Sequence, residues 1–60
     1  MSYLATLFSP TLDEFEVDCH TTIYWVGDLT EWLNALPDFY NEKRNVNDFV
    51  IISVIKIGDN

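Results

Sequence analysis

The segment Asp48–Ile57, with the sequence DFVIISVIKI, is the stretch around which the rest of the chain has to be arranged. β-branched residues dominate it, no Gly or Pro interrupts it, and turn-forming residues flank it, which is typical of a β-strand. Strand side chains alternate between two faces. This alternation predicts two groups that point to opposite sides: Phe49, Ile51, Ser53, Ile55 and Ile57, and Val50, Ile52, Val54 and Lys56. Because both groups are almost wholly apolar, we expect the strand to be covered on both sides, or to lie mid-sheet with its second face against a partner.

The chain is short, with 60 residues and one cysteine, Cys19. A domain of this size buries only about 60% of the surface that its unfolded chain exposes, so disulfides, a metal or oligomerisation usually support it. A lone cysteine forms no internal disulfide, and one His with one Cys cannot complete a four-ligand zinc site. We therefore expect one domain over residues 1–60, no metal or cofactor, and a homodimer.

The charge is strongly acidic, with ten Asp and Glu against three Lys and Arg, a net charge of −7. Such a charge repels nucleic acid and anionic membranes and favours a protein partner with a basic surface; it also keeps an apolar protein soluble. The N-terminal residues MSYL lack the positive charge of a signal peptide. No apolar run approaches the roughly 20 residues that span a bilayer. These features predict a cytoplasmic protein.

Two strands are predicted before the middle of the chain. Tyr3–Phe8 forms a short first strand, and Ser9–Asp13 a turn. Glu14–Trp25 alternates strictly between apolar and polar residues, which predicts one long, half-exposed strand antiparallel to the first. Its predicted core face comprises Phe15, Val17, Cys19, Thr21, Ile23 and Trp25. Its predicted solvent face comprises Glu14, Glu16, Asp18, His20, Thr22 and Tyr24.

A helix is predicted from Asp28, with Asp28 as the N-cap and Glu31 three residues later, as in a capping box. Pro37 interrupts it, so the segment is either one kinked helix to about Lys43 or two short helices. An apolar stripe that keeps its phase across Pro37 favours the kinked helix. The stripe comprises Leu29, Trp32, Leu33, Leu36, Phe39 and Tyr40. A polar return loop over Asn41–Asp48 then leads to the last strand.

These elements predict an α+β fold of the order β-β-α-β: a three-stranded antiparallel sheet, the last strand beside the first, with one helix on one face. Trp25 and Trp32 are expected in the core between sheet and helix. Cys19 and His20 are neighbours on a strand and so point to opposite faces, Cys19 into the core and His20 to the surface. Because a Cys–His nucleophilic pair needs both side chains within hydrogen-bond reach, and no other catalytic motif occurs, we predict no enzymatic activity.

The acidic row Glu14, Glu16 and Asp18 is the candidate binding surface. Same-face residues of a strand lie about 6.7 Å apart, close to the spacing of successive phosphates along one DNA strand. The row is either an ordinary solvated face or an imitation of a phosphate backbone, which Asp13, Asp28 and Glu31 could extend. An aromatic residue among charges is typical of an interface hot spot, as at Tyr24. The predicted partner-binding residues are Glu14, Glu16, Asp18, Tyr24, Asp28 and Glu31.

In size, acidity and general plan the chain resembles the small inhibitors that bacteriophages make against host enzymes, such as uracil-DNA glycosylase inhibitors, anti-restriction DNA mimics and anti-CRISPR proteins. One group of phage uracil-DNA glycosylase inhibitors is similar in layout and acts as a dimer. The resemblance is one of pattern, so it transfers no functional positions. It implies an inhibitor that occupies the DNA-binding surface of a host enzyme. The alternative is a structural or regulatory module, such as an antitoxin, an RNA-polymerase regulator or a complex subunit, that binds through its apolar strand and aromatic residues.

Overall fold

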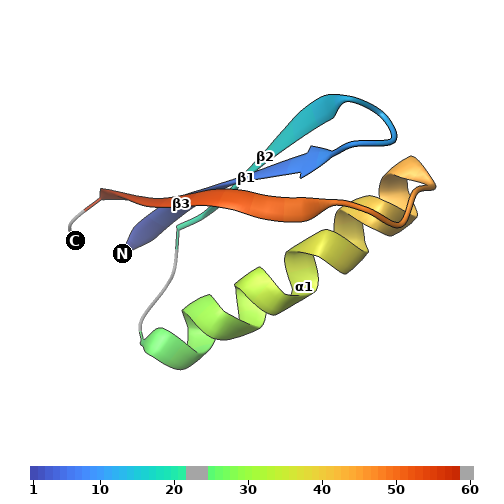
Figure 1. Cartoon of the computed structure of the whole chain (residues 1–60). Coiled ribbons are helices and arrows are strands. Elements are labelled where there is room, and N and C mark those ends of the chain that lie inside the picture. The colour runs from blue at the N-terminus through green and yellow to red at the C-terminus, as the bar shows by residue number, and fades with distance from the viewer. Residues whose placement is uncertain (22–24, 59–60) are drawn as a thin grey trace.

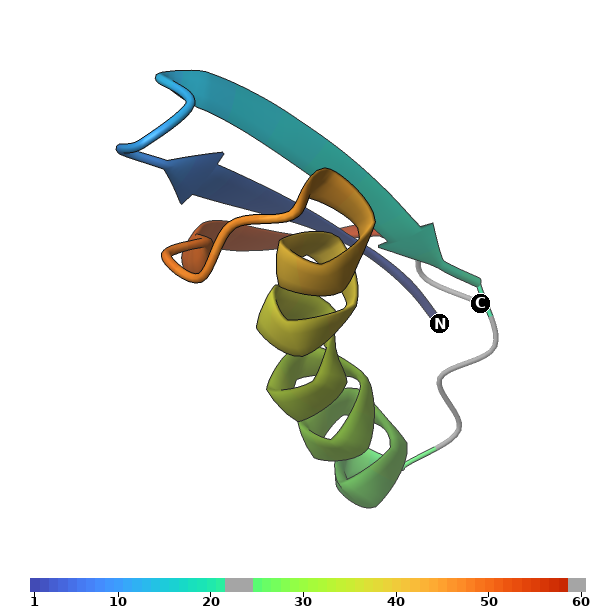
Figure 2. The same cartoon turned by 90° about the vertical axis from the view of Figure 1, so that its right-hand side faces the viewer.

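The computed structural model describes residues 1–21 and 25–58, so the predictions for Thr22, Ile23 and Tyr24 lie outside the described residues. The elements are β1 (Ser2–Ser9), β2 (Glu14–His20), α1 (Val26–Arg44) and β3 (Val50–Gly58). The three strands form one antiparallel sheet in the order β2-β1-β3. Figures 1 and 2 show α1 crossing one side of this sheet. The predicted α+β fold, with the last strand beside the first, is confirmed.

The core lies between β1, the start of β3 and one stripe of α1. Ala5 and Leu7 of β1 are fully buried, and they pack with Leu36, Tyr40 and Phe49. Leu36 and Tyr40 are four residues apart and therefore lie on one face of the helix. The predicted helical stripe is confirmed there, and Trp32 and Leu33 pack against the same cluster.

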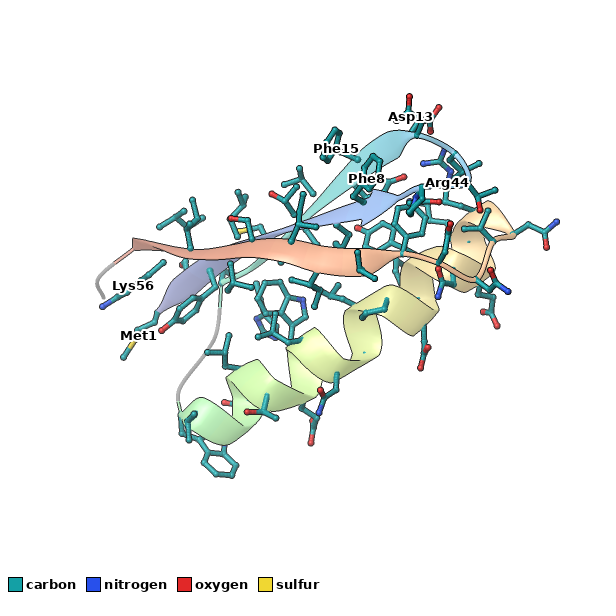
Figure 3. The ribbon with its side chains drawn as sticks, viewed as in Figure 1. Met1, Phe8, Asp13, Phe15, Arg44 and Lys56 are labelled. Carbon is teal, nitrogen blue, oxygen red and sulfur yellow. The ribbon has the colours of Figure 1, made fainter. Side chains whose placement is uncertain are left out.

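The opposite face of the sheet carries no other element within residues 1–21 and 25–58 (Figures 1 and 2). We call its side chains the open face. The pairing register places them in three rows across β2, β1 and β3: Phe15–Phe8–Val50, Val17–Thr6–Ser53 and Cys19–Leu4–Ile55. Figure 3 shows Phe8 and Phe15 on the side away from α1, and their ring centroids are 4.8 Å apart.

The strand β3 lies at the edge of the sheet, and its side chains do not keep the parity that the sequence predicts. Leu7 pairs with Ile51, but Thr6, the residue before Leu7 in β1, pairs with Ser53 and not with Ile52. Ile52 is therefore an extra residue, a β-bulge, which reverses the alternation beyond it. Ile51 thus faces the helix, while Ser53 and Ile55 lie on the open face.

The helix α1 is one continuous element of 19 residues that contains Pro37, so the two-helix alternative is wrong. It begins at Val26 with Trp25 as the N-cap and no side-chain capping bond, and Asp28 lies in the first turn. The predicted Asp28 N-cap and its capping box are therefore wrong. The backbone N–H of Asp28 instead donates to the Trp25 carbonyl over 3.0 Å, because β2 ends early and the helix already includes Val26 and Gly27.

The end of α1 lies beyond the predicted start of the return loop at Asn41. Asn45 adopts a left-handed conformation with φ 58° and ψ 46°, and the next backbone N–H, that of Val46, donates to the Asn41 carbonyl over 3.0 Å. This pattern closes a helix C-terminus, where Asn tolerates a positive φ. The first residues of the predicted loop therefore form the last helical turn.

Candidate functional site

The strand β2 has the alternation that the sequence predicts, but the side that faces the helix is the polar one. Phe15 and Val17 are 62% and 55% exposed, and Cys19 is also exposed, so the predicted core face of β2 is wrong. The reason lies in the pairing with β1. Asp18 is opposite Ala5, and Glu16 is opposite Leu7, so both carboxylates share the face on which Ala5 and Leu7 are fully buried.

The carboxylates of the acidic row are accordingly bonded to side chains of α1, although Glu14 stays exposed. Arg44, in the last turn of α1, forms ion pairs with both Glu14 and Glu16. These hydrogen bonds raise the pKa of the Arg44 guanidinium above its usual range. Asp18 accepts a hydrogen bond from the Tyr40 hydroxyl over 3.2 Å. The three carboxylates thus anchor the edge strand to α1 instead of presenting three free charges.

Two aromatic predictions for this part of the chain are also corrected. His20 is only partly exposed, because its ring meets the Trp32 indole edge-on, with centroids 5.4 Å apart. The predicted core position of Trp25 is wrong because β2 ends at His20, and Trp25 at the start of α1 is 66% exposed. Trp32 is confirmed against the core. Cys19 and His20 do point to opposite faces, so they form no catalytic pair.

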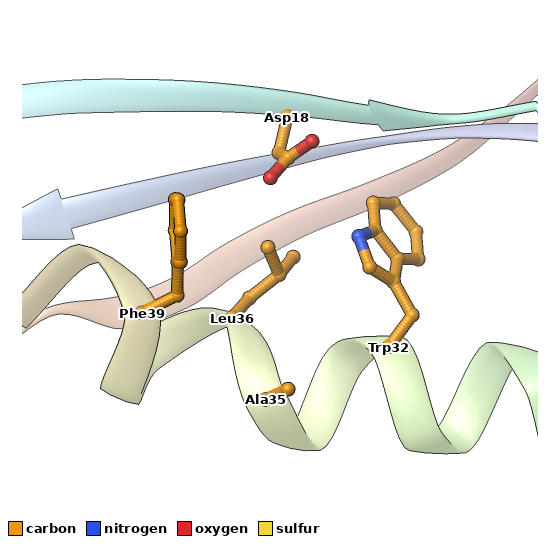
Figure 4. Close-up of a pocket in the computed structure, with 5 residues that line it drawn as sticks. All are labelled: Asp18, Trp32, Ala35, Leu36 and Phe39. Carbon is orange, nitrogen blue, oxygen red and sulfur yellow. The ribbon is translucent and has the colours of Figure 1, made fainter.

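A pocket of about 250 Å³ lies between β2 and α1. Figure 4 shows Asp18 pointing from β2 toward the helix, with Trp32 and Phe39 rising from α1 on either side of Leu36. Ala35 completes the lining. These helical residues, at 32, 35, 36 and 39, fall on one side of the helix because i, i+3, i+4 and i+7 are neighbours. The sequence places them on the helix, but not Asp18 above them.

The electrostatics of this pocket depend on Asp18. Burial raises the pKa of Tyr40, and the negative charge of Asp18 and its hydrogen bond raise it further. Tyr40 therefore stays protonated and donates to one oxygen of Asp18. A carboxylate offers about four acceptor positions, so this bond leaves most of them for a ligand. Among the residues that the structure describes, the ion pairs of Arg44 involve Glu14 and Glu16 but not Asp18.

The chemistry of the pocket suits a cation. Trp and Phe rings attract a cationic group placed over their faces, and a carboxylate gives charge-assisted hydrogen bonds to an ammonium or a guanidinium. Apolar walls accept the aliphatic part of a Lys or Arg side chain. A volume of about 250 Å³ accommodates one such side chain. Sequence reasoning missed Trp32 and Phe39 as site residues because helical aromatics usually belong to the core.

The other predicted acidic site residues lie elsewhere. Asp28 and Glu31 are in the first turns of α1. Glu31 falls with Asp38 and Glu42 on the side of the helix away from Leu36, whereas Asp28 lies only about a quarter of a turn from Leu36 and is partly buried. Glu31, Asp38 and Glu42 are exposed. The structure thus separates the predicted binding residues into the strand carboxylates, which face α1, and two helix residues, of which Glu31 faces solvent and Asp28 is partly buried.

Comparisons with known proteins give no identification: no family model, curated protein or solved structure matches the chain. Among residues 1–21 and 25–58, no group of three or more His, Cys, Asp or Glu side chains is placed to hold a metal ion. No helix in the same ranges is both long and apolar enough to cross a bilayer.

Proposed function

We propose that this protein is a non-enzymatic binder of another protein, and that a Lys or Arg side chain of that partner enters the pocket between β2 and α1. The observation that carries the proposal is the position of the Asp18 carboxylate above the Trp32 and Phe39 rings (Figure 4). Either part alone is common on protein surfaces. Together they provide both charge and aromatic contact for a cation.

The charge of the whole chain supports a partner with a basic surface. The net charge is −7. The exposed helix carboxylates Glu31, Asp38 and Glu42 lie on the side of α1 adjacent to the one that lines the pocket. Such a field accelerates association with a positively charged surface. Nucleic-acid-processing enzymes carry such surfaces where they bind phosphates, so the protein inhibits one of them by occupying that surface. Cytoplasmic location and phage origin belong to this proposal.

The test is capture of a partner from bacterial lysate, with elution by increasing salt and displacement by added DNA. The informative variant is Asp18→Asn, which removes the charge but keeps an oxygen that accepts from Tyr40. Its matched control is Asp13→Asn in the β1–β2 turn, where φ is 55°, a conformation that Asn also tolerates. We expect Asp18→Asn to weaken capture about tenfold or more and Asp13→Asn to leave it nearly unchanged.

Phe39→Ala provides a second test. Phe39 is 56% exposed, but its ring also meets the Tyr40 ring edge-on, with centroids 5.0 Å apart, so the free energy of unfolding of this variant is measured beside its binding. The variant should weaken capture by removing one aromatic wall. If both pocket variants bind as the wild type does, the pocket is not the site. A partner that resists salt and ignores DNA would contradict the proposed mimicry of nucleic acid.

A second candidate function rests on a different observation, the open face. Phe15, Val17, Val50 and Ile55 are each about half exposed or more, and exposed apolar patches mark interaction sites. A structural or regulatory module would bind its partner there. For that function, charge variants such as Asp18→Asn would have little effect, and a charge introduced at Val17 would abolish capture.

A further inference from the structure

Among residues 1–21 and 25–58, the open face contains no charged side chain, although the chain has a net charge of −7. Its three rows hold only apolar residues, Thr6, Ser53 and Cys19. The carboxylates of β2 all point to the other side of the sheet, toward Arg44 and Tyr40. Two copies of this acidic chain can therefore meet through their open faces without bringing carboxylates together, which is not true of the α1 side.

The three rows differ in side-chain size in a way that suits contact with a second copy. The row Phe15–Phe8–Val50 is bulky, the row Cys19–Leu4–Ile55 is of medium size, and the middle row Val17–Thr6–Ser53 is the smallest. A two-fold axis along the middle row places the bulky row of one copy over the Cys19 row of the other. Contact through the same patch on both subunits is the usual geometry of homodimers.

The size of the face fits a modest dimer. Three rows across three strands cover roughly 500 Å² of accessible surface per copy, so a dimer buries about 1,000 Å² in total, near the lower limit of specific interfaces. Burial of this surface would add to a small core, since the buried hydrophobic residues of the described part of the chain are only Ala5, Leu7, Leu36, Tyr40 and Phe49. Small domains with small cores commonly gain stability by oligomerisation.

We propose that the open faces of two copies pack together in a symmetric homodimer, Phe15 of each copy lying over Cys19 of the other. The two sheets then form a sandwich, with face-to-face packing about 10 Å apart. Both helices, both pockets and the helix carboxylates lie on the outside of this dimer. The assembly therefore presents two cation-binding pockets while its apolar surface is covered.

The mass of the full chain is measured by sedimentation equilibrium from micromolar to millimolar concentration, for the wild type and for Val17→Glu. Val17 lies in the middle row beside the axis. The substitution would therefore bury two carboxylates in the interface, one from each copy, facing each other. We expect the dissociation constant to rise at least about a hundredfold. The matched control is Val26→Glu, because Val26 is 72% exposed at the start of α1 and lies off the open face.

The thiol of Cys19 gives a second measurement that needs no variant. In a monomer Cys19 is exposed, so its reaction with a small thiol reagent is independent of protein concentration. In the dimer the thiol is covered, and its rate should fall as the protein concentration rises. A wild type that is monomeric at all concentrations would overturn the proposal. The proposal would also be overturned if Val17→Glu still formed the dimer and Cys19 stayed reactive in it. Pairing of two copies through their β3 edges would give that result.

Discussion

Ser9 and Asp48 are 39 residues apart and joined by a 2.6 Å hydrogen bond from the Ser9 hydroxyl to the Asp48 carboxylate. Ser9 is fully buried at the end of β1. The other oxygen of Asp48 accepts from the backbone N–H of Thr11 over 2.8 Å and from its hydroxyl over 2.6 Å. One carboxylate thus connects the β1–β2 turn to the entry of β3, beside the buried Phe49.

The first prediction concerns the pH dependence of stability through Asp48. The hydrogen bonds from Ser9 and Thr11 lower the pKa of Asp48 below its usual value. A group with a lowered folded-state pKa stabilises the protein above its unfolded-state pKa, and this stabilisation is lost as the pH falls through the folded value. Asp48→Asn should therefore lower the urea midpoint at pH 7 and flatten its decline below about pH 4. Asp38→Asn, on the exposed side of α1, is the matched control, and an unchanged acid limb in Asp48→Asn would contradict the assignment.

The second prediction concerns the Tyr40 hydroxyl. Tyr40→Phe keeps the buried ring but removes the hydrogen bond to Asp18, at an expected cost of about 1 kcal/mol in the free energy of unfolding. Because the pKa of Tyr40 is raised by burial and by Asp18, its contribution is present below the unfolded-state pKa of about 10 and is lost as the pH rises through the folded value. Denaturation at pH 8 to 11 should show a shallower alkaline decline in Tyr40→Phe. Tyr3→Phe serves as control for the loss of a hydroxyl.

The third prediction concerns Pro37 within the continuous helix α1. A proline inside a helix removes one backbone hydrogen bond and clashes with the preceding turn. Pro37→Ala should therefore raise the free energy of unfolding by about 1–3 kcal/mol. Part of this gain is offset because the unfolded chain without the proline has more conformational entropy. Thermal unfolding by circular dichroism measures this, with Asn34→Ala, an exposed position on the same helix, expected to change it by a few tenths of a kcal/mol. A destabilised Pro37→Ala would mean that the proline shapes the packing of α1 on the sheet.

The fourth prediction separates the two faces of the sheet with the same substitution on one strand. Leu7 is fully buried against Leu36 and Tyr40, so Leu7→Ala should cost about 2–5 kcal/mol, which is most of the stability of so small a domain. Leu4, on the open face, is only partly buried, and Leu4→Ala should cost far less. Both variants also carry Val17→Glu, so that the two free energies of unfolding are compared between monomers. Equal losses would show that the open face is buried within the monomer.

The order of elements, the antiparallel sheet and the apolar stripe of α1 follow from the sequence because they depend on local periodicity. The alternation of Glu14–His20 likewise separates carboxylates from apolar side chains without any tertiary information. Periodicity does not say which of the two sides the helix covers. The register of β2 with β1 decides that, since it places Glu16 beside Leu7 and Asp18 beside Ala5. Arg44 and Tyr40, on the same side of α1, then hold the carboxylates there.

The candidate site likewise depends partly on local spacing in the sequence and partly on which side of β2 faces the helix. Trp32, Leu36 and Phe39 could be placed together on the helix from their spacing alone, but Asp18 joins them only because β2 passes above α1 with its polar side down (Figure 4). In β3, the extra residue at Ile52 reverses the faces as far as the second register shift, at Ile57, and a bulge has no periodic signature. The sequence by itself determined the elements and the composition of their faces. Only the tertiary structure decided which faces meet, because strand register and helix position are set by contacts between residues far apart in the chain.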